Sequence, residues 1–134
     1  MSNSAYALTL FVGWTLLLLI AMEAIRSYLV LSGQVASNTF APDNEGLSPF
    51  MQRIARAHMN CVESLPVFGG ILAIAVMTSR TAVTDPLALW FVLARVAQSS
   101  VHLISTSVLA VNIRFAAFFV QIVMGVYWLW SLLR

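Results

Sequence analysis

The sequence predicts an all-α protein, an antiparallel bundle of four transmembrane helices. Hydrophobic residues make up 60% of the 134 residues and charged residues only 9%, whereas an average soluble domain has roughly 25% charged residues. So few charges could not cover a soluble domain, and disordered chains are polar rather than apolar. At about 20 residues per membrane-spanning helix, the chain has room for four spans joined by short loops.

The first helix is expected over residues 5–32. Its first eighteen residues, from Ala5 to Met22, have no charge, and Glu23 and Arg26 then follow on one helix face. Ser32-Gly33 is a typical helix end. The N-terminus has no positive n-region, so we expect this segment to remain as a membrane anchor rather than to be cleaved as a signal peptide.

The second helix is expected over residues 48–78, after a polar loop that spans residues 34–48. Ser48 is a natural N-cap for this helix, and Pro49 fits its first turn. Pro66 lies inside the helix and should kink it.

The third helix is expected over residues 86–106, with Asp85 as its cap and Pro86 at its first position. The fourth is expected over residues 112–133, and it ends in aromatic residues that are typical of a membrane interface: Tyr127, Trp128 and Trp130. We expect residues 1–134 to form a single integral-membrane domain.

The distribution of arginines predicts the orientation of the bundle. Most of them lie near the 1–2 and 3–4 loops, namely Arg26, Arg53, Arg56 and Arg114, while Arg80 and Arg134 lie near the opposite side. The positive-inside rule then places both termini outside and those two loops in the cytoplasm. No run of basic residues favours nucleic acid as a partner. The single cysteine excludes an intrachain disulfide and a multi-cysteine metal site.

Polar side chains recur at helical spacing within the apolar segments. Placing an ionisable side chain within the membrane costs about 3 kcal/mol of insertion free energy, so such a side chain normally faces protein or a water-filled cavity. Every expected helix has such a stripe: Glu23 and Arg26; Arg53, Arg56, Asn60 and Glu63; Arg95, Gln98, Ser99, His102 and Thr106; and Arg114, Gln121 and Gly125. The four stripes can converge on one buried polar seam.

Two interpretations of the seam remain open. In the first, Glu23, Arg56, Glu63 and Arg95 form intramembrane ion pairs that lock the helices together. In the second, the seam binds an anionic ligand, because the arginines of the membrane portion outnumber its two glutamates. Buried arginine suits a carboxylate, thiolate or phosphate, since its planar fork pairs bidentately with such groups.

The stretch from Arg56 to Phe68 has the pattern R-A-x-x-N-x-x-E-x-x-P-x-F. This pattern resembles the signature of the MAPEG family, the membrane-associated proteins in eicosanoid and glutathione metabolism. Three further matches lie outside the stretch: Gly33-Gln34-Val35, Ala94-Arg95-Val96 and Asn112-Ile113-Arg114. Order, spacing and length agree over nearly the whole chain, which resembles a diverged, bacterial-type member.

The resemblance implies a four-helix bundle assembled as a homotrimer in the lipid bilayer, with glutathione as co-substrate between adjacent subunits. Arg114, at the start of helix four, would stabilise the glutathione thiolate, which attacks or reduces a lipophilic electrophile. A cation beside a thiol lowers its pKa, which agrees with this role. The expected glutathione contacts are Arg26, Arg56, Asn60, Glu63, Arg95, Gln98 and His102.

The chain also departs from the glutathione-using members that it resembles. Ala36 stands where they have an arginine, and Gln98 and His102 stand at positions that are often tyrosine. Phe115 and Phe118 replace the serine and tyrosine of the prostaglandin-synthase branch, so hydroxyl donors are fewer. A non-catalytic lipid- or fatty-acid-binding protein of the same fold is therefore the alternative function.

Two residues of the second helix are expected to be structural. His58 lies away from the centre formed by Arg56, Asn60 and Glu63, and Cys61 is expected to be a small buried hydrophobe. A small four-helix efflux transporter is a third hypothesis, but such proteins depend on a glutamate near the middle of helix one. Glu23 lies late in its helix, and the transporter hypothesis leaves the second-helix motif unexplained.

Overall fold

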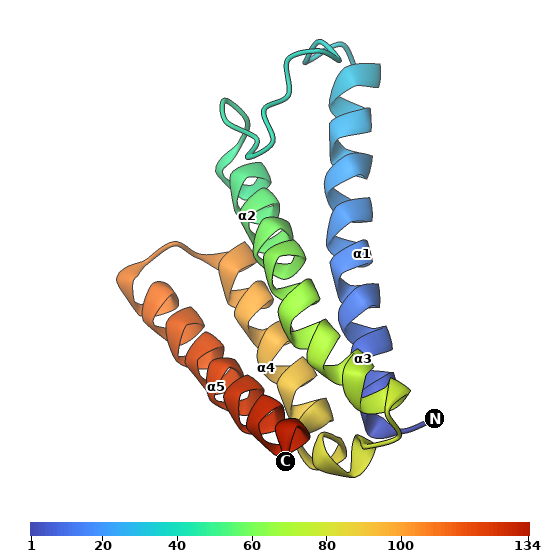
Figure 1. The fold of residues 1–134 in the computed structure, drawn as a ribbon. Helices are drawn as coiled ribbons and strands as arrows, with labels where there is room; N and C mark the ends of the chain where they lie inside the picture. The colour runs from blue at the N-terminus through green and yellow to red at the C-terminus, as the bar shows by residue number, and fades with distance from the viewer.

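The computed structural model describes all 134 residues, and it folds into four long antiparallel spans (Figure 1). This confirms the predicted fold class. The first span is α1 (Asn3–Leu31), and the second consists of α2 (Pro49–Ser64), the π-helical turn η1 (Leu65–Gly69) and α3 (Gly70–Met77). After a short 3₁₀ turn, η2 (Thr81–Val83), come α4 (Asp85–Ile104) and α5 (Val108–Leu133).

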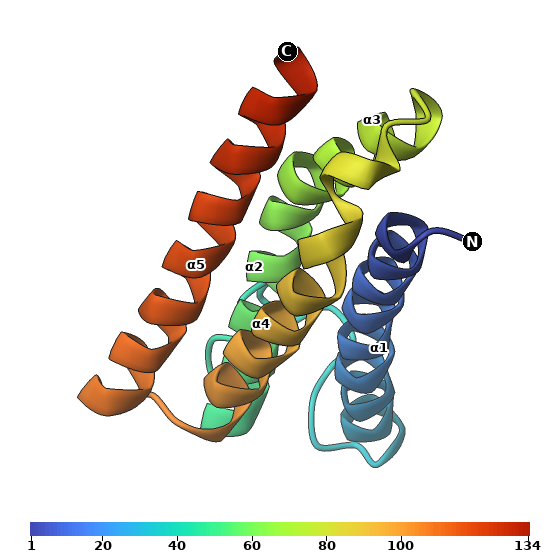
Figure 2. The same cartoon turned by 90° about the horizontal axis from the view of Figure 1, so that it is seen from below.

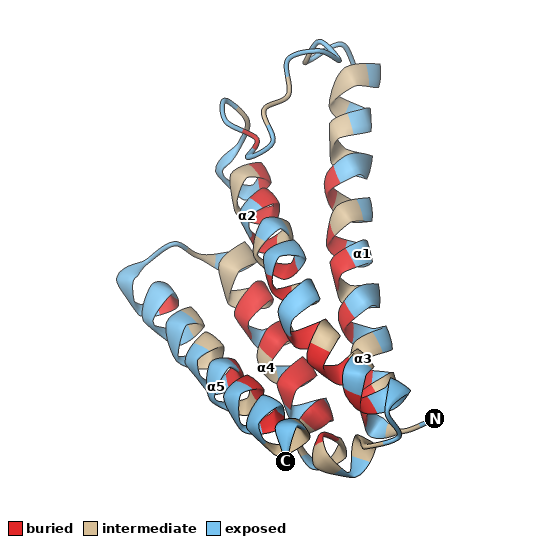
Figure 3. Cartoon of the chain, viewed as in Figure 1, coloured by how far each residue is buried: buried red, intermediate tan, exposed pale blue.

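Helix α4 is the centre of the bundle, because it packs against α1, α2 and α5. Helix α5 lies at the outside and packs mainly on α4 (Figure 2). Both termini lie at one end, and the long loop that joins α1 to α2 lies at the other (Figure 1). Buried residues of α1, α2 and α4 face the interior, whereas most of α5 is exposed (Figure 3). The exposed surface of α5 is apolar and suits contact with lipid.

The helix ends of the first half are where the sequence predicts them. Gly33 follows α1 with a φ of 76°, a left-handed conformation that glycine adopts without steric cost. Ser48 caps α2, because its hydroxyl accepts a 3.3 Å hydrogen bond from the Met51 amide. At Pro66 the second span forms the π-helical turn η1. A proline has no N–H for the helical ladder, and the turn accommodates that gap.

The prediction that Asp85 caps the third helix is wrong. Helix α4 begins at Asp85 itself, with Thr84 at the N-cap position. The Asp85 carboxylate instead accepts hydrogen bonds from the backbone N–H of Ser4, at 2.7 Å, and from its hydroxyl, at 2.6 Å. The side chain therefore ties the N-terminus of α1 to the start of α4.

The fourth span begins four residues earlier than the expected residue 112. Ser107 caps α5 by accepting a hydrogen bond of 3.2 Å from the Ala110 amide, and the connection from α4 is only residues 105–107. Several serines and threonines stand in this stretch, so the sequence offers more than one N-cap and packing selects among them. Arg114 consequently lies in the second turn of α5.

Candidate functional site

Four polar side chains meet at the centre of the bundle, in a group that we call the amide layer: Asn60, Arg95, Gln98 and Gln121. The side-chain oxygen of Asn60 accepts hydrogen bonds from Arg95, at 2.6 Å, and from Gln98, at 3.2 Å. Gln121 in turn donates to the Gln98 oxygen at 2.9 Å. The network joins α2, α4 and α5, so three of the four predicted polar stripes do converge.

Arg95 is the most deeply buried charge of the chain, with an exposed fraction of 0%. Its guanidinium lies 5.3 Å from the ring centre of Phe11, 6.0 Å from that of Phe68 and 5.9 Å from that of Phe118. Such contacts favour a cation, since aromatic faces are electron-rich. Its Nε and Nη2 atoms have no hydrogen-bond partner.

The interpretation that ion pairs lock the helices together is wrong for the single chain. The one ion pair of the structure joins Arg26 to Glu23 within α1, at 3.0 Å. Glu63 is exposed, and neither Arg56 nor Arg95 contacts a carboxylate. Helix packing turns Asn60 rather than Glu63 toward Arg95, and the membrane portion keeps uncompensated positive charge.

A second group, which we call the cation layer, contains Arg56, His102 and Arg114. Arg56 and Arg114 each lie near the His102 imidazole, on which their charges act. All three lie on the side of the amide layer that faces the 1–2 and 3–4 loops: Arg56 and His102 stand four residues from Asn60 and Gln98, and Arg114 stands seven residues from Gln121. The Nε atom of Arg114 is buried without a partner, and Arg56 is exposed.

An apolar groove of about 380 Å³ begins beside the amide layer. Its polar end is formed by Asn60, Glu63 and Ser64, and the rest lies between η1–α3 and α5. The remaining walls are mostly hydrocarbon and aromatic side chains: Val67, Phe68, Ile71, Phe118, Ile122, Val126 and Leu129, together with Gly125. The groove suits an apolar molecule whose polar or reactive part lies near Asn60.

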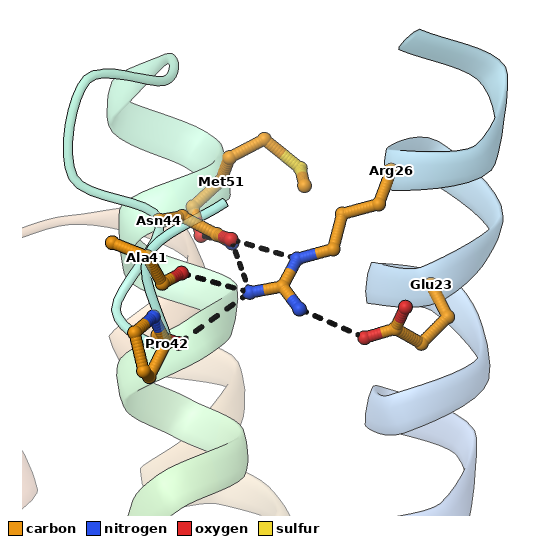
Figure 4. Close-up of polar contacts among 6 residues, drawn as sticks. All are labelled: Glu23, Arg26, Ala41, Pro42, Asn44 and Met51. Carbon is orange, nitrogen blue, oxygen red and sulfur yellow. Dashed lines mark hydrogen bonds and ion pairs between the residues drawn. The ribbon is translucent and has the colours of Figure 1, made fainter. Parts of the chain in front are cut away.

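Arg26 is the predicted site residue that the structure places elsewhere. It joins α1 to the long loop through Nε and Nη2, which donate to the Asn44 side-chain oxygen at 2.8 Å and 2.5 Å (Figure 4). Further bonds go to the Ala41 carbonyl and to Glu23, and the Asn44 amide donates to the Met51 carbonyl at 2.6 Å. We call this group the loop clamp; it does not join the cation layer.

Sequence reasoning did not assign a role to two residues of these groups. Asn44 is fully buried with a φ of 57°, and asparagine tolerates that left-handed conformation better than most residues. Gln121 completes the amide layer. It stands seven residues after Arg114 and so on the same helix face, and this spacing was the sequence signal that could have identified it. Both were visible as polar residues, but neither has a partner that can be read from the sequence.

The arrangement combines three chemical properties within the bundle. The cation layer offers positive charge and an unpaired buried donor, which suit an anion. The amide layer supplies directional hydrogen-bonding groups, and the groove offers apolar volume. A polar anion and a lipophilic molecule can therefore approach each other near Asn60.

Comparison with known proteins gives the same assignment as the motif. The model of the MAPEG family matches residues 4–134, essentially the whole chain. Searches of curated proteins and of solved structures returned no match. Because the match covers all four membrane spans and the second-helix motif, the chain belongs to the MAPEG family, integral membrane proteins whose members use glutathione.

Proposed function

We propose that the protein is a glutathione-dependent transferase or peroxidase that acts on a lipophilic electrophile. The observation behind this proposal is the cation layer, where Arg56, His102 and Arg114 lie together without an acidic partner. Glutathione has two carboxylates and a thiol that ionises, so it supplies the negative charge that this layer lacks. Asn60 and Glu63, at the polar end of the groove, are further contacts in this proposal.

Arg114 is the proposed catalytic residue. Its Nε–H is buried and unpaired, so it can donate to the glutathione sulfur without first breaking a bond within the chain. A neighbouring cation lowers the pKa of a thiol, which raises the thiolate fraction at neutral pH. In a transfer reaction the sulfur lone pair forms a bond to the electrophilic carbon, and the bond to the leaving group breaks. The groove would hold the apolar part of the electrophile during this step.

The proposal includes a homotrimer with the 1–2 and 3–4 loops on the cytoplasmic side. Arg56 and Glu63 are exposed in the single chain, so a neighbouring subunit can complete the glutathione site from the other side. Cytoplasmic glutathione could then reach the cation layer from the end of the bundle where the loops lie. Chemical cross-linking in membranes would test the assembly, and accessibility labelling of residues 34–48 would test the orientation.

The decisive experiment is calorimetric titration of the detergent-solubilised protein with glutathione, together with a conjugation assay. We expect binding at millimolar glutathione or below, and an Arg114→Ala variant should lose about a hundredfold to a thousandfold in turnover. Arg134→Ala is the matched control, because Arg134 lies at the exposed C-terminus and should leave turnover unchanged. Absence of glutathione binding would refute the proposal.

One observation favours a second candidate, a lipid- or fatty-acid-binding protein without catalysis. The groove walls are largely apolar, and Phe118 stands at a groove position where a hydroxyl donor would have served glutathione. This candidate predicts lipid that co-purifies with the protein, together with no conjugation of chlorodinitrobenzene. Turnover that disappears in the Arg114→Ala variant would exclude it.

A further inference from the structure

The hydrogen bonds of the amide layer all run in one direction, which is fixed at both ends of the network. At one end is Arg95, which has only donors, so the Asn60 amide must turn its oxygen toward the guanidinium, at 2.6 Å. The same oxygen accepts from the Gln98 amide, and this bond turns the Gln98 oxygen toward Gln121. At the other end, the Gln121 amide also donates to the backbone carbonyl of Ala117 at 3.0 Å. Each amide is therefore held in one of its two possible orientations.

This orientation leaves the NH₂ group of Asn60 available to the groove. Two donors occupy the Asn60 oxygen, while its Nδ2 atom has no partner in the chain. Unlike the unpaired atoms of Arg95 and Gln121, Nδ2 is not buried, and Asn60 lines the polar end of the groove. The side chain thus offers N–H donors that are already oriented, and a ligand at this end of the groove must bring an acceptor.

Two aromatic rings flank the same end of the groove. Phe68 and Phe118 line the groove, and their ring centres lie 6.0 Å and 5.9 Å from the Arg95 guanidinium, which also binds Asn60. The rings lie edge to face, with their centres 6.4 Å apart. A flat conjugated group packs well against aromatic side chains. The positive charge behind the rings favours a group that becomes negative during the reaction.

We propose that the Asn60 N–H binds the carbonyl oxygen of apolar α,β-unsaturated ketones and aldehydes, and that Arg95 is the residue that positions Asn60. This inference rests on the proposed glutathione transfer. The sulfur lone pair forms a bond to the β-carbon, the π electrons of the C=C bond shift toward the carbonyl, and Asn60 stabilises the resulting enolate oxygen. A proton from water, in place of the one that the thiol lost, then adds to the α-carbon. Glutathione is added as a whole, and no group leaves.

An Asn60→Asp variant separates the N–H donor from the network that holds it. The carboxylate keeps an acceptor for Arg95 and Gln98, so the variant should unfold at a temperature no lower than the unmodified protein. The measurement is the ratio of kcat/KM for benzylideneacetone to that for benzyl chloride, in which charge develops on chlorine. Weaker glutathione binding would slow both reactions and cancel in this ratio. We expect the ratio to fall about a hundredfold, whereas Asn38→Asp, the same change in the exposed loop, should not alter it.

Two variants of Arg95 test the positioning role. Arg95→Lys keeps a cation that can only donate, so it should preserve the ratio. Arg95→Leu removes the donor that orients Asn60, and the ratio should fall about tenfold. An unchanged ratio in Asn60→Asp would overturn the role of the Asn60 donor. If Arg95→Leu slowed both reactions equally, Arg95 would be a packing residue rather than a positioning one.

Infrared spectroscopy of bound benzylacetone, the saturated analogue, tests the contact without glutathione. A hydrogen bond from Asn60 should lower the carbonyl stretching frequency below that of the ketone in lipid, and Asn60→Asp should lose the lowered band. Absence of this band in a protein that conjugates benzyl chloride would overturn the inference and leave the proposed transfer standing. The lowered band in a protein that conjugates neither compound would support the Asn60 contact and refute the transfer reaction.

Discussion

Two arginines of this chain illustrate two ways of keeping a guanidinium inside a membrane protein. In the loop clamp, every nitrogen of Arg26 donates to an oxygen, from Glu23, from Asn44 or from loop carbonyls. In the amide layer, Arg95 is more deeply buried, yet only its Nη1 atom has a partner, Asn60. Each nitrogen of the peripheral arginine has a hydrogen-bond partner, whereas two nitrogens of the central arginine have none.

The difference separates an arginine that holds a loop from arginines that keep unpaired hydrogen-bond donors. Arg26 fixes the path of the long loop, and its donors are not free for a ligand. Arg95 and Arg114 keep unpaired buried donors beside the groove and in the cation layer. Because an unpaired buried donor costs free energy, Arg114 would gain from contact with the anionic ligand that we propose for it.

The largest effect on stability is expected from Asn60→Ala, which breaks the amide layer. This substitution removes the shared acceptor of Arg95 and Gln98, so two buried donors lose their partner. We expect a loss of about 3 kcal/mol in the free energy of unfolding, measured by denaturant titration in mixed micelles. Met59→Ala changes an exposed neighbour on the same helix and should cost much less. Equal losses would show that the network adds nothing.

Asn44→Gly tests the loop clamp and should cost about 2 kcal/mol, because Arg26 loses two hydrogen bonds to the Asn44 side chain. Asn44→Ala should cost slightly more than Asn44→Gly, since the φ of 57° at this position is unfavourable for alanine. Amide hydrogen exchange of residues 34–48 should accelerate in both variants. If exchange in this loop does not change, the clamp does not hold it.

Gly125→Ala tests the packing around the amide layer, since a Cβ at this position would lie 2.9 Å from the Phe68 ring. Phe68 stands against Arg95, so its displacement should cost about 1 to 2 kcal/mol. The matched control is Gly13→Ala, which meets nothing within 4 Å and should stabilise α1 by up to about 1 kcal/mol. Thermal unfolding in detergent compares the two, and equal shifts would contradict the close packing of Phe68.

The smallest effect is expected from Glu23→Gln, which removes the one ion pair. The Glu23 side chain is 50% exposed, and exposed ion pairs contribute about 0.5 kcal/mol or less. Arg26 keeps its bonds to the loop in this variant. A denaturant titration that showed a loss as large as that of Asn44→Gly would mean that the ion pair, and not Asn44, holds the clamp.

Helical spacing predicts which side chains share a face, and it did so correctly for much of the site. The stripe that contains Asn60 and the stripe that contains Arg95 and Gln98 do meet, and Glu23 and Arg26 do pair within one helix. Spacing does not predict how two helices are rotated about their axes relative to each other. That rotation brings Asn60 to Arg95 and leaves Glu63 in the groove, which is why the expected ion pairs do not form.

The sequence by itself determined the membrane class, the four spans, the main loop and the family, because these depend on the lengths of apolar segments and on local motifs. Only the tertiary structure decided which polar side chains from different segments become partners. Asp85 binds Ser4 from 81 residues away rather than its own helix, and Arg26 binds Asn44 in the loop. Such choices depend on which surfaces pack together, and packing is a property of the whole fold rather than of any one segment.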